Sequence, residues 1–258
     1  MKRFLDIVVS LIALVVFLPL GLVIAVILRA TGEGEIFYVH PRIGKNGKVF
    51  GLIKFATMLK DSPNLGTGDI TLRNDPRVLP FGWLLRKMKI NELPQIINVL
   101  KGDMSIIGPR PLTPQNFDYY SDKVKKAICR MRPGLSGVGS IIFRDEEKMV
   151  SDSHLPCREF YRKYIATYKG ELEMWYEHNR SLWVDISLFF LTVWAIIFPR
   201  THLIFRLFAS IPQRPLSLVD EENRRGDRSL VRASKDASGI VEITTAGRSA
   251  DQSEVLKS

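Results

Sequence analysis

The stretch Lys89–Pro111, KINELPQIINVLKGDMSIIGPRP, decides the fold of this chain. Apolar residues recur at helical spacing from position 93 to position 100, which predicts a short amphipathic helix. Asn91 is a favourable N-cap, and Gly102 is a favourable C-terminal stop. Glu92 is then expected at a helix N-terminus, where free N–H groups and the helix dipole attract anions or a metal-bound phosphate.

Arg110 lies a few residues further on, between Pro109 and Pro111. Each proline fixes its own backbone angle and restricts the residue before it. The guanidinium is therefore held in few orientations, which suits bidentate recognition of a phosphate. From spacing alone, a capped amphipathic helix followed by a rigid turn explains the whole stretch equally well.

Three segments of this stretch, Glu-Leu-Pro-Gln, Asn-Val-Leu-Lys-Gly-Asp-Met-Ser and Gly-Pro-Arg-Pro, resemble the signature of the bacterial sugar transferases. These are monotopic phosphoglycosyl transferases, and the resemblance runs from Lys2 to about Phe198. It implies transfer of a sugar phosphate from a UDP-sugar to polyprenyl (undecaprenyl) phosphate, with release of UMP. Such a reaction initiates polysaccharide or glycoconjugate synthesis, as in exopolysaccharide or lipopolysaccharide. The resemblance also implies Mg²⁺, with Glu92 as its ligand, and the cytoplasmic face of the bacterial inner membrane.

The chain departs from this family at the catalytic pair, which is Asp-Glu in the family and Asn91-Glu92 here. The family's Asp is the covalent nucleophile, and a neutral amide is a poor nucleophile. Three hypotheses follow. Another carboxylate serves as nucleophile or metal ligand, with Asp69, Asp75 and Asp103 as candidates; or the lipid phosphate attacks the sugar nucleotide directly; or the protein is inactive and serves as a lipid-phosphate binder or scaffold at the membrane surface.

Further basic residues are expected to neutralise substrate phosphates together with Arg110. The candidates are Arg42, Lys54, Arg77 and Arg86. Arg42 and Lys54 flank a predicted β-hairpin, whose turn is Gly44-Lys45-Asn46-Gly47. As an alternative, these cations are surface charges that attract anionic membrane lipid.

The segment Ile7–Leu28 contains no charged residue and is long enough to cross a bilayer. Pro19 lies near its middle, where proline removes a backbone hydrogen bond and kinks a helix. Basic residues flank both ends, so the positive-inside rule places both on the cytoplasmic side. We therefore expect a re-entrant helix–break–helix with its break at Pro19, and a straight span is the alternative.

Two further segments suggest contact with a membrane surface. Residues 81–88 combine Trp and Leu with basic side chains, as interfacial helices do. Residues 155–169 interleave basic and aromatic side chains, which is typical of a membrane interface or of a nucleic-acid surface. Residues 181–198 are strongly apolar but interrupted by Asp185, which predicts a buried or interfacial helix.

Composition sets the remaining bounds. The chain has 258 residues and a formal net charge of +10, which implies anionic partners. No recognised nucleic-acid motif occurs, so we expect no nucleic acid, and the oligomeric state stays open, a homo-oligomer included. We predict a mostly helical α+β fold in three parts: a membrane-embedded segment (1–30), a phosphoglycosyl transferase domain at the membrane surface (31–206) and a disordered polar tail (207–258).

Overall fold

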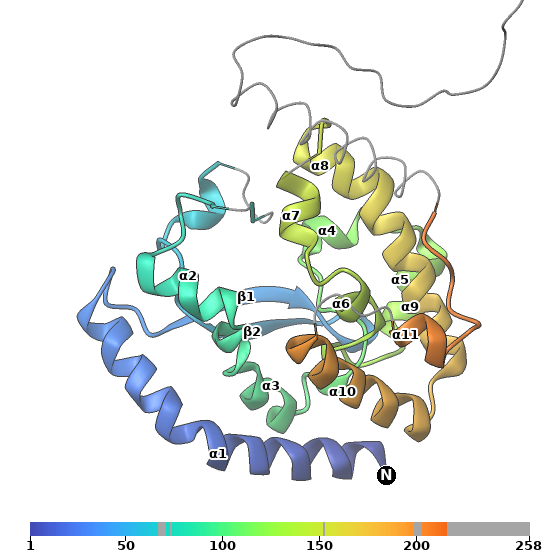
Figure 1. Cartoon of the computed structure of the whole chain (residues 1–258), viewed down its shortest axis with the longest axis horizontal. Helices are drawn as coiled ribbons and strands as arrows, with labels where there is room; N and C mark the ends of the chain where they lie inside the picture. Colours follow the sequence, from blue (N-terminus) through green and yellow to red (C-terminus); the bar gives the residue numbers. More distant parts are fainter. Residues whose placement is uncertain (67–70, 73, 152, 199–202, 216–258) are drawn as a thin grey trace, which may run out of the picture.

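The computed structural model describes residues 1–66, 71–72, 74–151, 153–198 and 203–215. Its architecture is mostly helical α+β, as predicted, with two small two-stranded sheets among the helices (Figure 1). The described α-helices are α1 (Lys2–Ala30), α2 (Pro80–Lys87), α3 (Gln95–Lys101), α4 (Pro114–Phe117), α5 (Asp122–Cys129), α6 (Val138–Ile142), α7 (Glu146–Ser151), α8 (Cys157–Phe160), α9 (Thr167–Asn179), α10 (Leu182–Ile197) and α11 (Leu203–Leu207).

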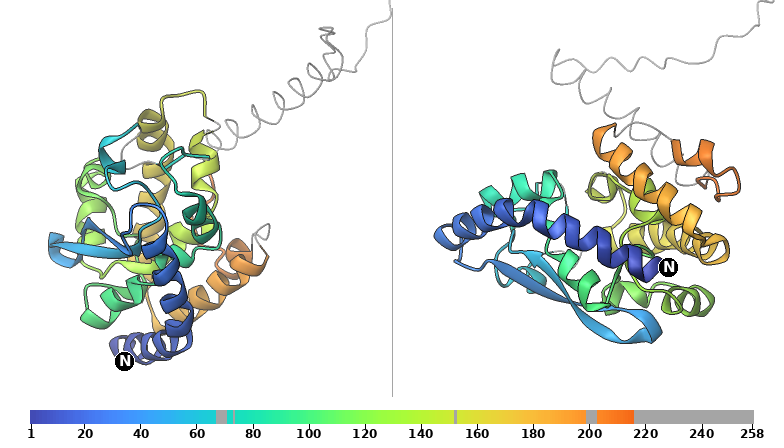
Figure 2. Two further views of the ribbon diagram at one scale, coloured as in Figure 1. Left: turned by 90° about the vertical axis from the view of Figure 1, so that its left-hand side faces the viewer. Right: turned by 90° about the horizontal axis from the view of Figure 1, so that it is seen from below.

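The apolar N-terminal segment forms the single long helix α1, which bends along its length (Figure 1, Figure 2). The chain stays helical through Pro19, so the expected break is a bend without loss of helix. By length and composition α1 could cross a membrane, and little of its apolar stretch is buried.

Both ends of α1 pack on the same domain. Near its start, the Asp6 carboxylate accepts hydrogen bonds from the Ser105 hydroxyl at 2.9 Å and the Ile106 N–H at 3.0 Å. Near its end, Ile24 and Leu28 are buried in one cluster with residues 55 and 85. Because the two ends of a straight span would lie on opposite sides of a bilayer, this geometry favours the re-entrant form.

The predicted hairpin is confirmed. Strands β1 (Phe37–Ile43) and β2 (Val49–Phe55) pair antiparallel, and the 3₁₀ turn η1 (Lys45–Gly47) connects them. Helix α3 is fixed on β2 by Asn98, whose Oδ1 accepts the Ile53 N–H at 3.0 Å and whose Nδ2 donates to the Gly51 carbonyl at 2.8 Å. This amide satisfies backbone groups of the strand edge that would otherwise lack partners.

The second sheet places the proline turn. Strand β3 (Ser105–Ile107) pairs parallel with β4 (Gly134–Ser136), so the Arg110 turn that follows β3 lies beside β4. The two backbones approach closely, because a Cβ at Gly134 would meet the Gly108 nitrogen at 2.1 Å. Only glycine fits at position 134, because any side chain there would clash with the Gly108 backbone.

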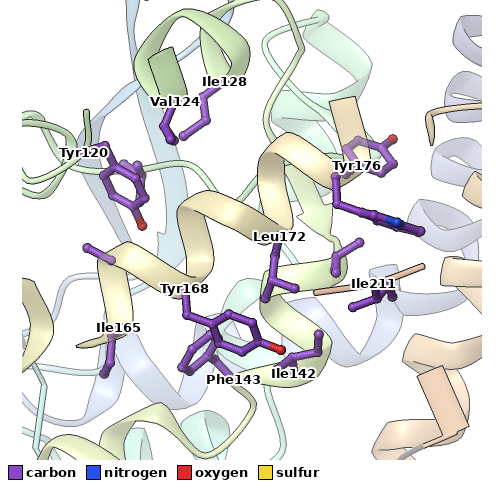
Figure 3. Packing of buried hydrophobic residues seen from close by; sticks show 14 of the residues in the cluster. Tyr120, Val124, Ile128, Ile142, Phe143, Ile165, Tyr168, Leu172, Tyr176 and Ile211 are labelled. Carbon is purple, nitrogen blue, oxygen red and sulfur yellow. The ribbon is translucent and has the colours of Figure 1, made fainter. Parts of the chain in front are cut away.

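The main core surrounds α9, whose Tyr168, Leu172 and Tyr176 are buried among side chains of the neighbouring helices (Figure 3). Phe160 and Tyr161 belong to the same core, and Tyr161 begins the π-helical turn η4 (Tyr161–Ala166). The expectation that residues 155–169 lie on the membrane surface is therefore wrong for these aromatic side chains, because packing against α5 and α6 encloses them.

The polar tail was predicted to begin at residue 207, but the residues just after this position are packed. Ile211 is only 2% exposed, and the Tyr168 hydroxyl donates to the Pro212 carbonyl at 2.8 Å. Ile211 supplies the apolar side chain and Pro212 the backbone acceptor that hold this segment on the core around α9. Residues 216–258 lie outside the described part of the chain.

Candidate active site

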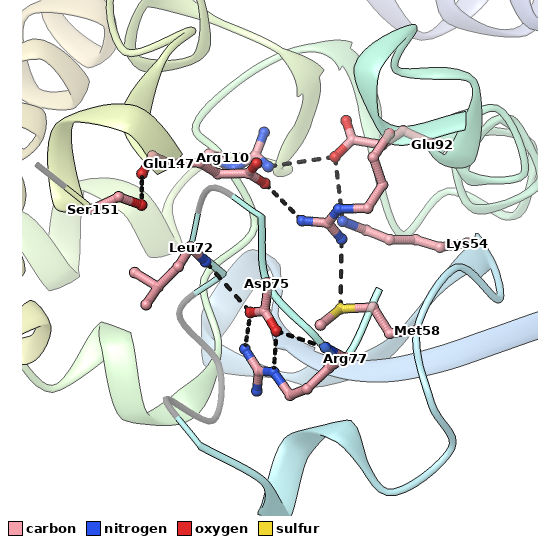
Figure 4. A network of polar contacts seen from close by, with 10 residues as sticks. Lys54, Met58, Leu72, Asp75, Arg77, Glu92, Arg110, Glu147 and Ser151 are labelled. Carbon is pink, nitrogen blue, oxygen red and sulfur yellow. Dashed lines mark hydrogen bonds and ion pairs between the residues drawn. The ribbon is translucent and has the colours of Figure 1, made fainter. Parts of the chain in front are cut away.

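Three separate elements bring Glu92, Lys54 and Arg110 together. Lys54 comes from β2, Glu92 from the 3₁₀ turn η3 (Ile90–Glu92), and Arg110 from the turn after β3. Lys54 Nζ lies 3.2 Å from Glu92 Oε1, and Arg110 Nη2 lies 3.4 Å from the same oxygen. Figure 4 shows both cations converging on this carboxylate.

The charges of this cluster set its protonation states. Burial alone would raise the pKa of Glu92, but Lys54, Arg110 and Lys89 outweigh burial and hold this pKa well below its usual range. Burial lowers the pKa of Lys54 to about 8, with Arg110 and Arg42 acting in the same direction and Glu92 opposing them. Glu92 is therefore ionised at neutral pH and the cluster stays cationic overall.

Asn91 does not cap a helix, so this prediction is wrong. Helix α3 begins at Gln95 with Pro94 in the N-cap position, and the chain enters η3 through Lys89, whose φ is 59°. Glu92 therefore lies in η3, two residues before the N-cap of α3. The Asn91 side chain is buried, and in the described part of the chain its Oδ1 has no hydrogen-bond partner.

A cavity of about 700 Å³ opens over this cluster. Most of the predicted site residues line it: Arg42, Lys54, Arg86, Asn91, Glu92 and Arg110. Arg42 Nη1 donates to the Pro111 carbonyl at 3.2 Å, which supports the proline turn. Arg86 Nη2 donates to Glu147 Oε1 at 2.6 Å, so this ion pair joins α2 and α7, and both residues line the cavity.

The structure assigns Arg77 to the loop rather than to the cavity. Its guanidinium is 6% exposed and pairs with Asp75 at 2.6 Å. It also donates to the carbonyls of Ser62 and Leu65, each at 2.8 Å. Because one fixed guanidinium satisfies the carboxylate and both carbonyls, Arg77 links Asp75 to residues 62 and 65 and does not line the cavity.

The alternative carboxylates are not brought to the cavity where the structure describes them. The hydrogen bond from Arg77 lowers the pKa of Asp75, whose carboxylate also accepts from its own loop. Asp103 follows the C-terminal end of α3 and accepts from Asn98 Nδ2 at 3.3 Å. Asp69 lies outside the described residues.

Sequence reasoning missed the wall that faces Glu92. It includes Lys169 of α9, which is 4% exposed and pairs with Glu146 Oε2 at 2.5 Å. The Lys169 ammonium also lies over the rings of Phe143 and Tyr161, at 5.2 and 5.6 Å from their centroids. Several of residues 138–147 also line the cavity, and no local pattern in their sequence indicates that position.

Glu173 of α9 holds the backbone of the proline turn. Its carboxylate accepts the backbone N–H of Arg110, which is the one N–H in Pro109-Arg110-Pro111. Burial raises the pKa of Glu173 to about 7. A Cβ at Gly139 would meet Glu173 Oε1 at 2.9 Å, so the glycine leaves room for this carboxylate.

The remaining wall is apolar. Helix α10 contributes Phe189, Val193 and Ile196 to the cavity lining, while Trp194 and Ile197 are exposed on its outer side. Helices α1 and α10 lie on the same side of the molecule (Figure 1, Figure 2), and Lys2 joins them through an ion pair with Asp185 at 2.8 Å. The cavity therefore has a polar, basic floor and an apolar flank next to the exposed apolar helices.

The fold and this site define a membrane-associated α+β protein whose cavity is lined by basic side chains and lies next to its apolar helices. The chain belongs to the bacterial sugar transferase family, whose sequence model matches residues 1–199. It is 32% identical over 213 residues to the exopolysaccharide production protein ExoY of Rhizobium meliloti, covering 77% of this chain and 86% of that protein.

Two other relatives differ in how much of their length is matched. A UDP-glucose:undecaprenyl-phosphate glucose-1-phosphate transferase of Caulobacter vibrioides is 33% identical over 201 residues, covering 76% of this chain and 69% of that protein. An uncharacterized sugar transferase of Haemophilus influenzae is 33% identical over 211 residues, covering 76% of this chain. The chain spans only 41% of the Haemophilus protein.

Proposed function

We propose that this protein is a phosphoglycosyl transferase that moves a sugar phosphate from a UDP-sugar to polyprenyl phosphate and releases UMP. In this reaction an oxygen of the acceptor phosphate bonds to the phosphorus next to the sugar. The bond from that phosphorus to the bridging oxygen breaks, and the oxygen leaves with UMP. The family membership and the names of the relatives support this reaction class.

The observation that carries the proposal is the Lys54–Glu92–Arg110 cluster on the floor of the cavity. One ionised carboxylate is shared by two cations, so the floor keeps a positive charge that a diphosphate can neutralise. Arg110 presents a planar fork on a rigid turn, which suits a phosphate group better than a flexible cation does. We assign the donor diphosphate to this floor, with Arg86 and Arg42 at its edge.

We further propose that the acceptor phosphate attacks the donor directly, without a covalent enzyme intermediate. Asn91 has no charge with which to attack, and Asp75 and Asp103 are held away from the cavity by other partners. Glu92 is ionised but already shared by Lys54 and Arg110, which suits a residue that positions charges. Positioning and charge neutralisation are the main requirements of phosphoryl transfer.

Mg²⁺ remains part of the proposal, with Glu92 as its protein ligand. Among the described residues no group of three acidic, His or Cys side chains is placed to hold a metal. Mg²⁺ usually takes only one or two carboxylates together with substrate phosphates, so a single carboxylate fits. Both hydrogen bonds to Glu92 end on Oε1, which leaves Oε2 for a cation. When bound, Mg²⁺ would neutralise charge on the donor diphosphate.

The membrane setting follows from the apolar helices. We propose that α1 enters the cytoplasmic leaflet of the bacterial inner membrane and returns to the same side. Trp83 and Leu84 of α2 are exposed, and Lys87 lies 4.8 Å from the Trp83 ring centroid, as expected for an interfacial helix that contacts anionic lipid.

The test uses purified full-length protein in phosphatidylcholine nanodiscs with Mg²⁺, polyprenyl phosphate and a panel of UDP-sugars. We expect UMP release that requires both substrates. Glu92→Gln keeps the shape of the side chain and should reduce turnover by about a hundredfold or more, whereas Glu171→Gln, an exposed change on α9, should not. If no UDP-sugar gave UMP, the protein would instead be a lipid-phosphate binder or scaffold.

A further inference from the structure

Two residues that line the cavity have polar atoms without a partner among the described residues. Ser140 Oγ and Arg144 Nη1 line the cavity, and both atoms are buried without a hydrogen-bond partner in the described part of the chain. Buried polar atoms in proteins nearly always have a partner. Their position in a cavity wall indicates that a bound ligand supplies it.

Arg144 carries a charge that no protein carboxylate balances among the described residues. Its hydrogen bond runs from Nη2 to the Ile196 carbonyl near the end of α10, at 3.5 Å. This long contact restrains the guanidinium only weakly, and Nη1 stays buried beside the cavity without a partner among the described residues. A bound anion could therefore draw the guanidinium toward the cavity. A partly buried guanidinium without a carboxylate is a favourable site for a phosphate, which it can bind through two parallel hydrogen bonds.

The surface next to Arg144 is apolar. Phe189, Val193 and Ile196 of α10 line the cavity, and Trp194 and Ile197 continue the apolar surface outward. The hydroxyls of Ser136 and Thr192 lie 2.8 Å apart, which fixes α10 on β4 so that this wall stays in place. The ligand that fits combines an anionic head with a long apolar chain.

We propose that Ser140, Arg144 and the inner face of α10 form the acceptor site, which binds the phosphate of polyprenyl phosphate and the first part of its chain. This inference rests on the proposed function and gives the acceptor a location distinct from the donor floor. A phosphate monoester presents three terminal oxygens and nearly two charges, enough for the Arg144 fork and the Ser140 hydroxyl together. The phosphodiester of a bulk phospholipid presents fewer oxygens and one charge.

The two sites belong to one cavity of about 700 Å³, with the donor phosphates assigned to the Lys54–Glu92–Arg110 floor and the acceptor phosphate to Arg144. Both substrates are then bound together before the phosphoryl group moves. This arrangement requires intersecting lines in two-substrate kinetics instead of the parallel lines of a ping-pong enzyme.

Binding is tested without turnover, by displacement of a fluorescent polyprenyl phosphate from protein in phosphatidylcholine nanodiscs. The competitors are polyprenyl phosphate, polyprenol and phosphatidic acid. Arg144→Met should weaken polyprenyl phosphate binding by about tenfold, and Ser140→Ala by a few-fold. Lys148→Met removes an exposed charge on α7 outside the cavity lining and should change nothing. Phosphatidic acid has the same monoester head, so its competition measures how much of the affinity the head alone supplies. Polyprenol lacks the phosphate and should compete weakly; polyprenol competing as well as polyprenyl phosphate would overturn the proposal.

Steady-state kinetics provide the second readout. Arg144→Met should raise the KM for polyprenyl phosphate by about tenfold, with the KM for UDP-sugar nearly unchanged, and Arg144→Lys should restore part of the loss. An increase confined to the KM for UDP-sugar would overturn the assignment. If the unmutated protein released no UMP, the proposed function would fail, but the nanodisc measurement would still decide whether Arg144 binds the acceptor. Thermal unfolding of each variant shows whether it is folded.

Discussion

Lys54 Nζ lies 3.2 Å from Glu92 Oε1, and this contact joins the hairpin to the turn that precedes α3. Because Arg110 donates to the same oxygen, the geometry of three elements depends on one carboxylate. Burial lowers the pKa of Lys54 to about 8, so the charge of this lysine is sensitive to mildly alkaline pH.

A pH profile tests this relationship. Lys54 is protonated below pH 8 and loses its charge as the pH rises through about 8, so kcat/KM for UDP-sugar should fall above that pH. Lys54→Arg carries a cation that does not titrate in this range. The variant should therefore lack the alkaline fall, even if its activity at neutral pH is lower. If kcat/KM of the variant fell at the same pH as in the unmutated protein, the titrating group would not be Lys54.

Arg110→Lys should lower activity more than is expected for a substitution that conserves the charge. The lysine keeps the charge but not the planar fork, and the flanking prolines allow little readjustment. We expect kcat/KM to fall by at least about tenfold, which corresponds to roughly 1.4 kcal/mol of transition-state stabilisation. Arg130→Lys, at a largely exposed side chain paired with Glu177, is the matched control. Kinetics unaltered by Arg110→Lys would limit this arginine to a structural role in the turn.

Asn91→Asp tests whether the reaction is direct. The new carboxylate would lie beside Glu92 and close to cations, so we expect the variant to fold. It should gain a phosphosugar adduct, visible by intact-protein mass spectrometry, after incubation with UDP-sugar and Mg²⁺ but without acceptor. The unmutated protein should show no adduct. An adduct on the unmutated chain would rule out direct transfer, and peptide mapping would then start with Asp69.

Cysteine labelling tests the re-entrant course of α1. In a chain with Cys129→Ser and Cys157→Ser, we place a cysteine at exposed Phe4 or at exposed Lys123 in α5. A membrane-impermeant maleimide should label both sites from the same, cytoplasmic side. Labelling of Phe4→Cys from the outside would establish a span. Pro19→Ala, which restores the missing backbone donor, should straighten α1 and increase labelling from the outside.

The local chemistry of the chain could be predicted well from its sequence. The hairpin follows from short β-rich runs around the Gly44-Lys45-Asn46-Gly47 turn, and Asn46 and Gly47 adopt the expected positive φ angles. Gly102 ends α3 at φ 93°, as expected for a residue without a Cβ. The rigid Arg110 turn and the apolar character of α1 also follow directly from residue types and their spacing.

The tertiary structure alone decided which of these pieces meet. Arg77 and Arg110 are both arginines next to proline, yet Arg77 is enclosed by Asp75 and loop carbonyls while Arg110 faces the cavity. The opposite wall with Arg144 and Lys169 depends on contacts between α6, α7 and α9, which no local pattern encodes. Asn91 shows the same limit, since it lies in the separate turn η3 while Pro94 takes the N-cap position of α3. Propensities act over a few residues, whereas burial and ion pairing depend on partners far away in the sequence, so the sequence determined the parts of this protein and the packing of those parts determined the site.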